Sequence, residues 1–86
     1  MNKITHEIFK KLSVEKRYQL LKERGEHVAG RYWTDYNVHL YTLDGLFVEV
    51  WIKMGANQIY WIEIQKNKEI LAEYANQVDI SKLIRD

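Results

Sequence analysis

One histidine and two glutamates in the middle of the chain are residue types that acid–base or metal chemistry needs. They are His39, Glu49 and Glu63, whereas His6 and His27 are isolated in the sequence. An imidazole beside a carboxylate can act as a general acid–base pair, and the same groups can supply ligands to Zn²⁺ or another divalent metal. The chain contains no H-E-x-x-H motif, no glycine-rich phosphate loop and no nucleophile elbow. A cross-strand pair of His39 with Glu49, which offsets the repulsion between Glu49 and Glu63, is the simpler explanation of these residues, so we expect no catalytic activity, no cofactor and no bound metal.

Aromatic residues are the second group with functional potential. They make up 13% of the chain, with three tryptophans and six tyrosines. Tryptophan and tyrosine dominate the hot spots of protein interfaces, and aromatic side chains on a sheet can also stack the bases of single-stranded nucleic acid. The candidate interface residues are Tyr41, Phe47, Trp51 and Trp61.

Length and composition narrow the classes of protein to consider. A chain of 86 residues has room for one domain, which we place at residues 1–86. The formal net charge of +1 offers no general attraction to nucleic acid. The absence of cysteine and of a recognisable secretory leader favours the cytoplasm. No apolar run approaches the roughly 18 residues that would span a bilayer, so we expect no membrane association.

Hydrophobic periodicity predicts the elements that must position these side chains. Ser13 suits the cap of a second helix because its hydroxyl can accept a hydrogen bond from a free amide of the first turn. Asn67 suits the start of a later helix for the same reason, and Asp79 begins a short final turn. The expected fold class is α+β, a four-stranded antiparallel β-meander flanked by two N-terminal helices and one or two C-terminal helices. The predicted helices cover 4–11, 14–24 and a segment from 67 onward, and the predicted strands cover 27–32, 36–42, 46–54 and 58–65.

The turn between the second and third strands decides which side chains share a sheet face. A two-residue loop of Asp44 and Gly45 would place Leu40 opposite Glu49, so that both faces mix apolar and charged groups. A three-residue loop closed by a bulge at Gly45 would instead place Leu40 opposite Val48 and make one face almost wholly aliphatic. Burying each aliphatic side chain contributes about 1.5–3 kcal/mol, more than the preference for a turn type. We therefore predict the bulged turn.

The same parity predicts the pairings of the outer strands. A three-residue loop at 55–57 would place Ile52 opposite Tyr60, Val50 opposite Ile62 and Val48 opposite Ile64. A three-residue loop at 33–35 would place Val28 opposite Leu40.

The bulged register places the chemically interesting residues together on the second face of the sheet. An aromatic patch made of Tyr41, Phe47, Trp51 and Trp61 would then lie beside a polar group that offers a ligand site. A soluble monomer seldom exposes so large an apolar patch without a use for it, although a helix of the same chain that crosses this face would make it a second core layer. The polar group consists of His39, Glu49, Glu63 and Arg31.

These patterns predict a small cytoplasmic protein-interaction module without enzymatic activity, which self-associates as a homodimer or binds a protein partner through the aromatic face. Single-stranded nucleic acid is the first alternative, but Glu49 and Glu63 would repel its phosphate backbone. A ligand or metal site at His39 and the glutamates is the second alternative.

Overall fold

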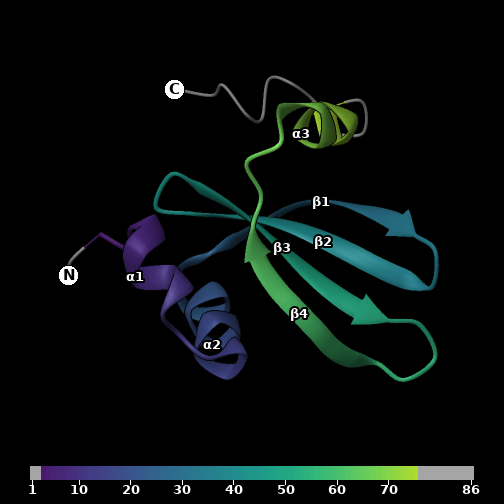
Figure 1. The fold of residues 1–86 in the computed structure, drawn as a ribbon, viewed down its shortest axis with the longest axis horizontal. Coiled ribbons are helices and arrows are strands. Elements are labelled where there is room, and N and C mark those ends of the chain that lie inside the picture. The colour runs from purple at the N-terminus through teal and green to yellow at the C-terminus, as the bar shows by residue number, and fades with distance from the viewer. Residues whose placement is uncertain (1–2, 76–86) are drawn as a thin grey trace.

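The computed structural model describes residues 3–75 and shows a four-stranded sheet with helices at both ends of the chain. The strands pair in the order β1-β2-β3-β4, each antiparallel to its neighbour, which confirms the predicted α+β meander (Figure 1). The predicted final turn from Asp79 lies outside the described residues. The elements are α1 His6–Lys10, α2 Val14–Arg24, β1 Glu26–Trp33, β2 Tyr36–Leu43, β3 Leu46–Lys53, β4 Gln58–Ile64 and α3 Lys68–Ala75.

Side-chain caps explain where the helices begin. The Ser13 hydroxyl accepts a hydrogen bond from the Lys16 amide at 3.2 Å, as predicted, and Thr5 caps α1 in the same way. The Asn67 side chain accepts from the Glu69 amide at 2.9 Å before the first turn of α3. These oxygens satisfy amides that have no partner within the helix.

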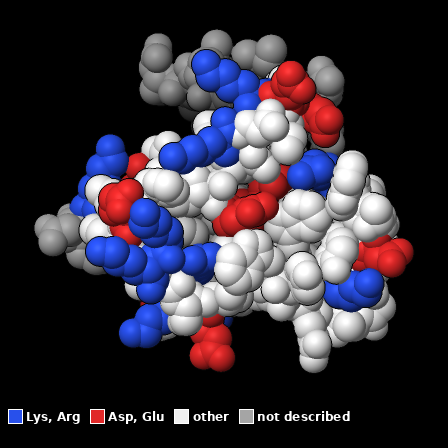
Figure 2. Space-filling view, viewed as in Figure 1, with Lys and Arg blue, Asp and Glu red and all other residues white. Residues whose placement is uncertain are grey.

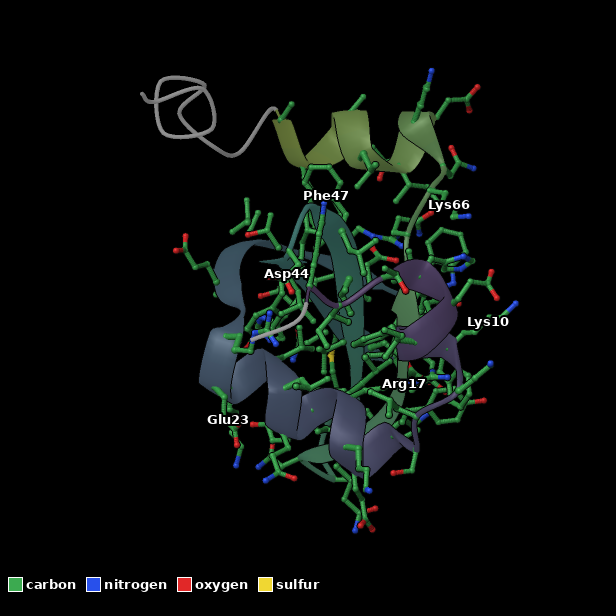
Figure 3. The ribbon with its side chains drawn as sticks, turned by 90° about the vertical axis from the view of Figure 1, so that its left-hand side faces the viewer. Lys10, Arg17, Glu23, Asp44, Phe47 and Lys66 are labelled. Atoms are coloured by element: carbon green, nitrogen blue, oxygen red, sulfur yellow. The ribbon has the colours of Figure 1, made fainter. Side chains whose placement is uncertain are left out.

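The β2–β3 turn differs from the predicted one. It is a two-residue turn of Asp44 and Gly45, both with positive φ (49° and 84°), and it places Leu40 opposite Glu49. The prediction of a bulged turn is therefore wrong, and β2 is shifted by one residue against β3. A tight turn of this kind matches the right-handed twist of the flanking strands. The Asp44 carboxylate also accepts a 2.7 Å hydrogen bond from the Ile4 amide and pairs with Arg24, which holds the turn against the N-terminal segment (Figure 3).

The observed register is compatible with burial because helices cover at least part of both faces, so apolar side chains are buried on each side of the sheet. Helices α1 and α2 lie together beside one face, here called the first face, and α3 lies apart from them over part of the second face (Figures 1 and 3). The first core contains Phe9, Leu21, Leu43, Val48, Val50 and Ile62, each no more than 1% exposed. The second contains Ala29, Leu40 and Tyr74, with Val28, Ile70 and Leu71 packed against them. The alternative in which a helix crosses the second face is therefore correct for part of that face.

Register shifts in the two edge strands change the outer pairings as well. In β1, Val28 is the extra residue, so Ala29 rather than the predicted Val28 lies opposite Leu40. In β4, Tyr60 is the extra residue, so Ile52 lies opposite Ile59 rather than the predicted Tyr60. An extra residue turns the side chains beyond it to the opposite face.

The remaining sheet connections agree with the predictions only in part. The predicted pairs of Val50 with Ile62 and of Val48 with Ile64 are confirmed. The β1–β2 connection is again shorter than predicted, a two-residue turn in which Thr34 has a φ of 47°.

Candidate functional site

The predicted interface residues do not form one surface. Trp51 and Trp61 are cross-strand partners on the second face, as predicted. Phe47 shares their face but lies at the other end of β3, opposite Thr42 and beside the β2–β3 turn. Tyr41 lies on the first face, where it packs against the core beneath α1 and α2, because the two-residue turn reverses the parity of β2.

The second face does carry an aromatic surface, at the end of the sheet farther from the β2–β3 turn. Trp33 lies opposite Tyr36, and the Tyr36 ring contacts Trp51 edge-on at 5.6 Å and Tyr60 at 5.0 Å between ring centroids. Trp33, Tyr60 and Trp61 are 56%, 64% and 43% exposed. Figure 2 looks onto this face and shows uncharged surface over the strand ends, beside the acidic side chains below α3. This aromatic surface consists of Trp33, Tyr36, Trp51, Tyr60 and Trp61.

Sequence reasoning missed three members of this surface, namely Trp33, Tyr36 and Tyr60. Trp33 and Tyr36 flank a turn of two residues, Thr34 and Asp35, and a tight turn there would have placed both rings on one face. Tyr60 reaches the surface through the extra residue in β4, for which the local sequence carries no clear signal.

Basic side chains lie against the rings of the aromatic surface. The Lys53 ammonium is 5.0 Å from the Tyr36 ring centre, and the Arg31 guanidinium is 5.4 Å from that of Trp51. At the β4 edge, Arg17 reaches from α2, donates a 2.6 Å hydrogen bond to the Ile62 carbonyl and lies 5.1 Å from the Trp61 ring. Cations in these positions are attracted to the negative faces of the rings. They also hold the rings in defined orientations while leaving part of each ring open to solvent.

A buried polar network lies beside the aromatic surface and includes Tyr74 of the core beneath α3. Glu49 is 0% exposed, and its carboxylate accepts hydrogen bonds from Arg31 Nε at 3.0 Å, Gln65 Nε2 at 2.7 Å and the Tyr74 hydroxyl. Burial, together with the hydrogen bond to Glu49, raises the pKa of Tyr74 far above its ordinary value. Desolvation of Arg31 is outweighed by its bonds to Glu49 and Tyr74, so its pKa is also raised. Glu49 is thus enclosed by three donors, and because Tyr74 belongs to α3 the network joins this helix to the sheet.

The predicted His and Glu group is divided between the two faces. Glu49 and Glu63 are cross-strand partners on the second face, together with Arg31. His39 lies on the first face, where its Nδ1 atom is 3.0 Å from Nε2 of His27. The expected pair of His39 with Glu49 does not form, because the two-residue turn reverses the parity of β2 and places His39 opposite Val50. Within residues 3–75 there is no cluster of three or more His, Cys, Asp or Glu side chains that could hold a metal ion.

A cavity of about 410 Å³ lies where the aromatic surface meets α3. Trp33 and Trp51 line its aromatic side, and Ile70 and Glu73 line it from α3. Glu63 and Gln65 from the end of β4, together with Arg31, complete the lining. Apolar walls with a few polar groups are typical of a place where a ligand or a partner side chain inserts.

Comparison with known proteins gives no match to a family model, to a curated protein or to a solved structure. Function is therefore inferred from the residues and their geometry. None of the helices in the described part of the chain combines the length and the apolar character needed to cross a membrane.

Proposed function

We propose that the protein is a small cytoplasmic interaction module, without enzymatic activity, that associates with a second copy of itself through the aromatic surface. The observation that carries the proposal is the gathering of Trp33, Tyr36, Trp51, Tyr60 and Trp61 from all four strands on the part of the second face outside the core beneath α3. Tryptophan and tyrosine supply large contact areas at a low entropic cost, and they are the residues most often found at interface hot spots.

The exposed area is large enough to support a weak dimer. An aromatic side chain buries roughly 150–250 Å² when it is covered, so covering the exposed parts of Trp33, Tyr60 and Trp61 would remove roughly 300 Å² from water in each copy. At ~25 cal/mol per Å², two copies would gain about 15 kcal/mol before costs. Lost rotational and translational freedom costs about 4–15 kcal/mol, so the net gain is between about 0 and 11 kcal/mol. Because roughly 600 Å² in total is small for an interface, we expect the dimer to be weak and transient.

Charges of both signs around the aromatic surface favour a second copy as the occupant. Arg31 and Lys53 lie against rings of the surface, and Glu63 and Glu73 line the cavity beside it. A two-fold axis through the surface can bring the cations of one copy toward the carboxylates of the other. A net charge of +1 adds little repulsion between copies.

The test is the mass of the protein in solution, measured by light scattering or sedimentation over a range of concentrations. Wild type should move from the mass of one chain to that of two as concentration rises, and the Trp33→Glu and Trp61→Glu variants should remain monomeric because each buries a carboxylate in the interface. Phe47→Glu is the matched control, since Phe47 is 38% exposed on the same face but lies at the other end of β3. A wild-type protein that stays monomeric up to about 1 mM contradicts the proposal, because a weaker dimer would gain less than about 4 kcal/mol. Equal loss of dimer in the Phe47→Glu control would locate the interface elsewhere.

Single-stranded nucleic acid is the second candidate, and the cations beside Trp51, Trp61 and Tyr36 favour it. Stacked bases with nearby Arg or Lys are typical of such binding, although Glu63 would repel phosphates. It predicts quenching of tryptophan fluorescence by oligonucleotides that weakens as salt is added. Absence of quenching at low salt would eliminate this candidate.

A further inference from the structure

A pair of histidines on the first face lies outside the aromatic surface and outside both cores. His27 in β1 is exposed and His39 in β2 is half-buried, and their nearest ring nitrogens, Nε2 of His27 and Nδ1 of His39, are 3.0 Å apart. The extra residue Val28 makes this approach possible: it leaves His27 opposite Tyr41 and Gly30 opposite His39. His27, which the sequence pattern left isolated, therefore has a partner.

The separation of the two nitrogens suits a metal ion as well as a hydrogen bond. Two neutral imidazoles can share one N–H···N bond at this distance when one donates and the other accepts. Imidazole nitrogens bind Zn²⁺ at ~2.0–2.1 Å. When the angle between two such bonds lies between the square-planar and the tetrahedral value, the two nitrogens are roughly 2.9–3.4 Å apart. The nitrogens of His27 and His39 already have the separation that bidentate coordination requires.

The surroundings leave the lone pairs of the pair accessible. Gly30, which lies opposite His39, places no side chain beside the ring, and His27 is exposed to solvent. The ring of Tyr41 meets the ring of His27 edge-on at 5.3 Å between centroids, which restricts rotation of the imidazole.

We propose that His27 and His39 form a bidentate binding site for a divalent transition-metal ion of the kind that prefers imidazole, such as Cu²⁺, Ni²⁺ or Zn²⁺. No third His, Cys, Asp or Glu joins them among residues 3–75, so the remaining coordination positions take water or an external ligand. The site is independent of the proposed dimer, because it lies on the opposite face of the sheet.

Copper is the sharpest probe, because affinity for nitrogen ligands rises toward Cu²⁺ along the first-row series. Titration of the purified full chain with Cu²⁺ should show one tight equivalent, and its electron paramagnetic resonance spectrum should show splitting from two imidazole nitrogens. His27→Gln and His39→Gln should each weaken binding at least tenfold and remove the two-nitrogen pattern. Circular dichroism of each variant checks that the sheet is intact.

His6→Gln is the matched control, because the third histidine of the chain lies in α1 and contacts Lys66 rather than the pair. It should bind Cu²⁺ as wild type does. Equal binding by wild type, His27→Gln and His39→Gln overturns the site, and so does a loss in His6→Gln as large as that in the other two variants.

Discussion

The two faces of the sheet are closed by helices in different ways. Beneath α1 and α2 the contacts are mostly apolar, with Leu21, Val50 and Ile62 among the fully buried residues. Beneath α3 the apolar cluster is smaller, and the fully buried Glu49 is linked to it by the hydrogen bond that its carboxylate accepts from the Tyr74 hydroxyl on the helix. Apolar burial is non-directional, whereas a buried carboxylate needs its donors in defined places. We therefore expect the first face to supply most of the stability, and the hydrogen bonds of Glu49 on the second face to fix the position of α3.

The largest effect is expected from removing apolar volume on the first face. Leu21→Ala deletes a side chain that is 1% exposed and leaves a cavity, which should lower the free energy of unfolding by about 2–5 kcal/mol. Leu20→Ala is the matched control, since this neighbouring leucine is only half-buried and should cost about 1 kcal/mol. Urea unfolding followed by circular dichroism measures both. Similar losses in the two variants would show that the first core does not dominate.

A smaller and more local effect is expected from Glu49 on the second face. Glu49→Gln keeps the shape but turns one acceptor oxygen into an amide donor that faces Arg31, Gln65 or Tyr74. Hydrogen bonds to charged groups contribute about 1.5–3 kcal/mol, so the loss should lie in that range.

Hydrogen exchange shows whether that loss is local. Amides of α3 should exchange faster in Glu49→Gln, while those of β2 and β3 should change less, because the network joins the helix to the sheet. Glu63→Gln is the control: it alters the half-buried cross-strand neighbour of Glu49 and should change stability by less than about 0.5 kcal/mol. Unchanged protection of α3 in Glu49→Gln would mean that the apolar contacts alone hold this helix.

The same contrast explains how much the sequence could predict. The elements, their order and the inward direction of Val48 and Val50 follow from periodicity, turn residues and caps, which are local signals. The step that failed was the assumption that only one face of the sheet is buried. Under that assumption a glutamate in a strand must face water, yet Glu49 is fully buried because Arg31 and Tyr74, distant in sequence, supply its donors.

The predicted members of the aromatic site depended on the same assumption, because it decided the register of β2 against β3. Once the parity of β2 is reversed, Tyr41 and His39 leave the second face, while Tyr36 joins Trp51 there. The extra residue Tyr60 adds another ring. Such bulges are decided by packing across the whole sheet, and a single residue shifts every later side chain, so local sequence predicts an aromatic surface but not its members.

The smallest effect is expected from pH, and it concerns the uncovered part of the first face. Burial, and then the charge of His27, lowers the pKa of His39 below the value of about 6.5 that it has in the unfolded chain. Below about pH 6.5 the unfolded chain therefore binds more protons than the folded protein. The free energy of unfolding is highest above that pH and falls as the pH decreases toward the pKa of His39 in the folded protein. His39→Gln removes this titration, and its free energy of unfolding should decline less steeply with acid than that of wild type. The measurement is the free energy of unfolding between about pH 7 and 5, with a chelator present to keep metal ions away from the two histidines. Identical slopes for wild type and His39→Gln would show that the environment of His39 has no effect on stability in this pH range.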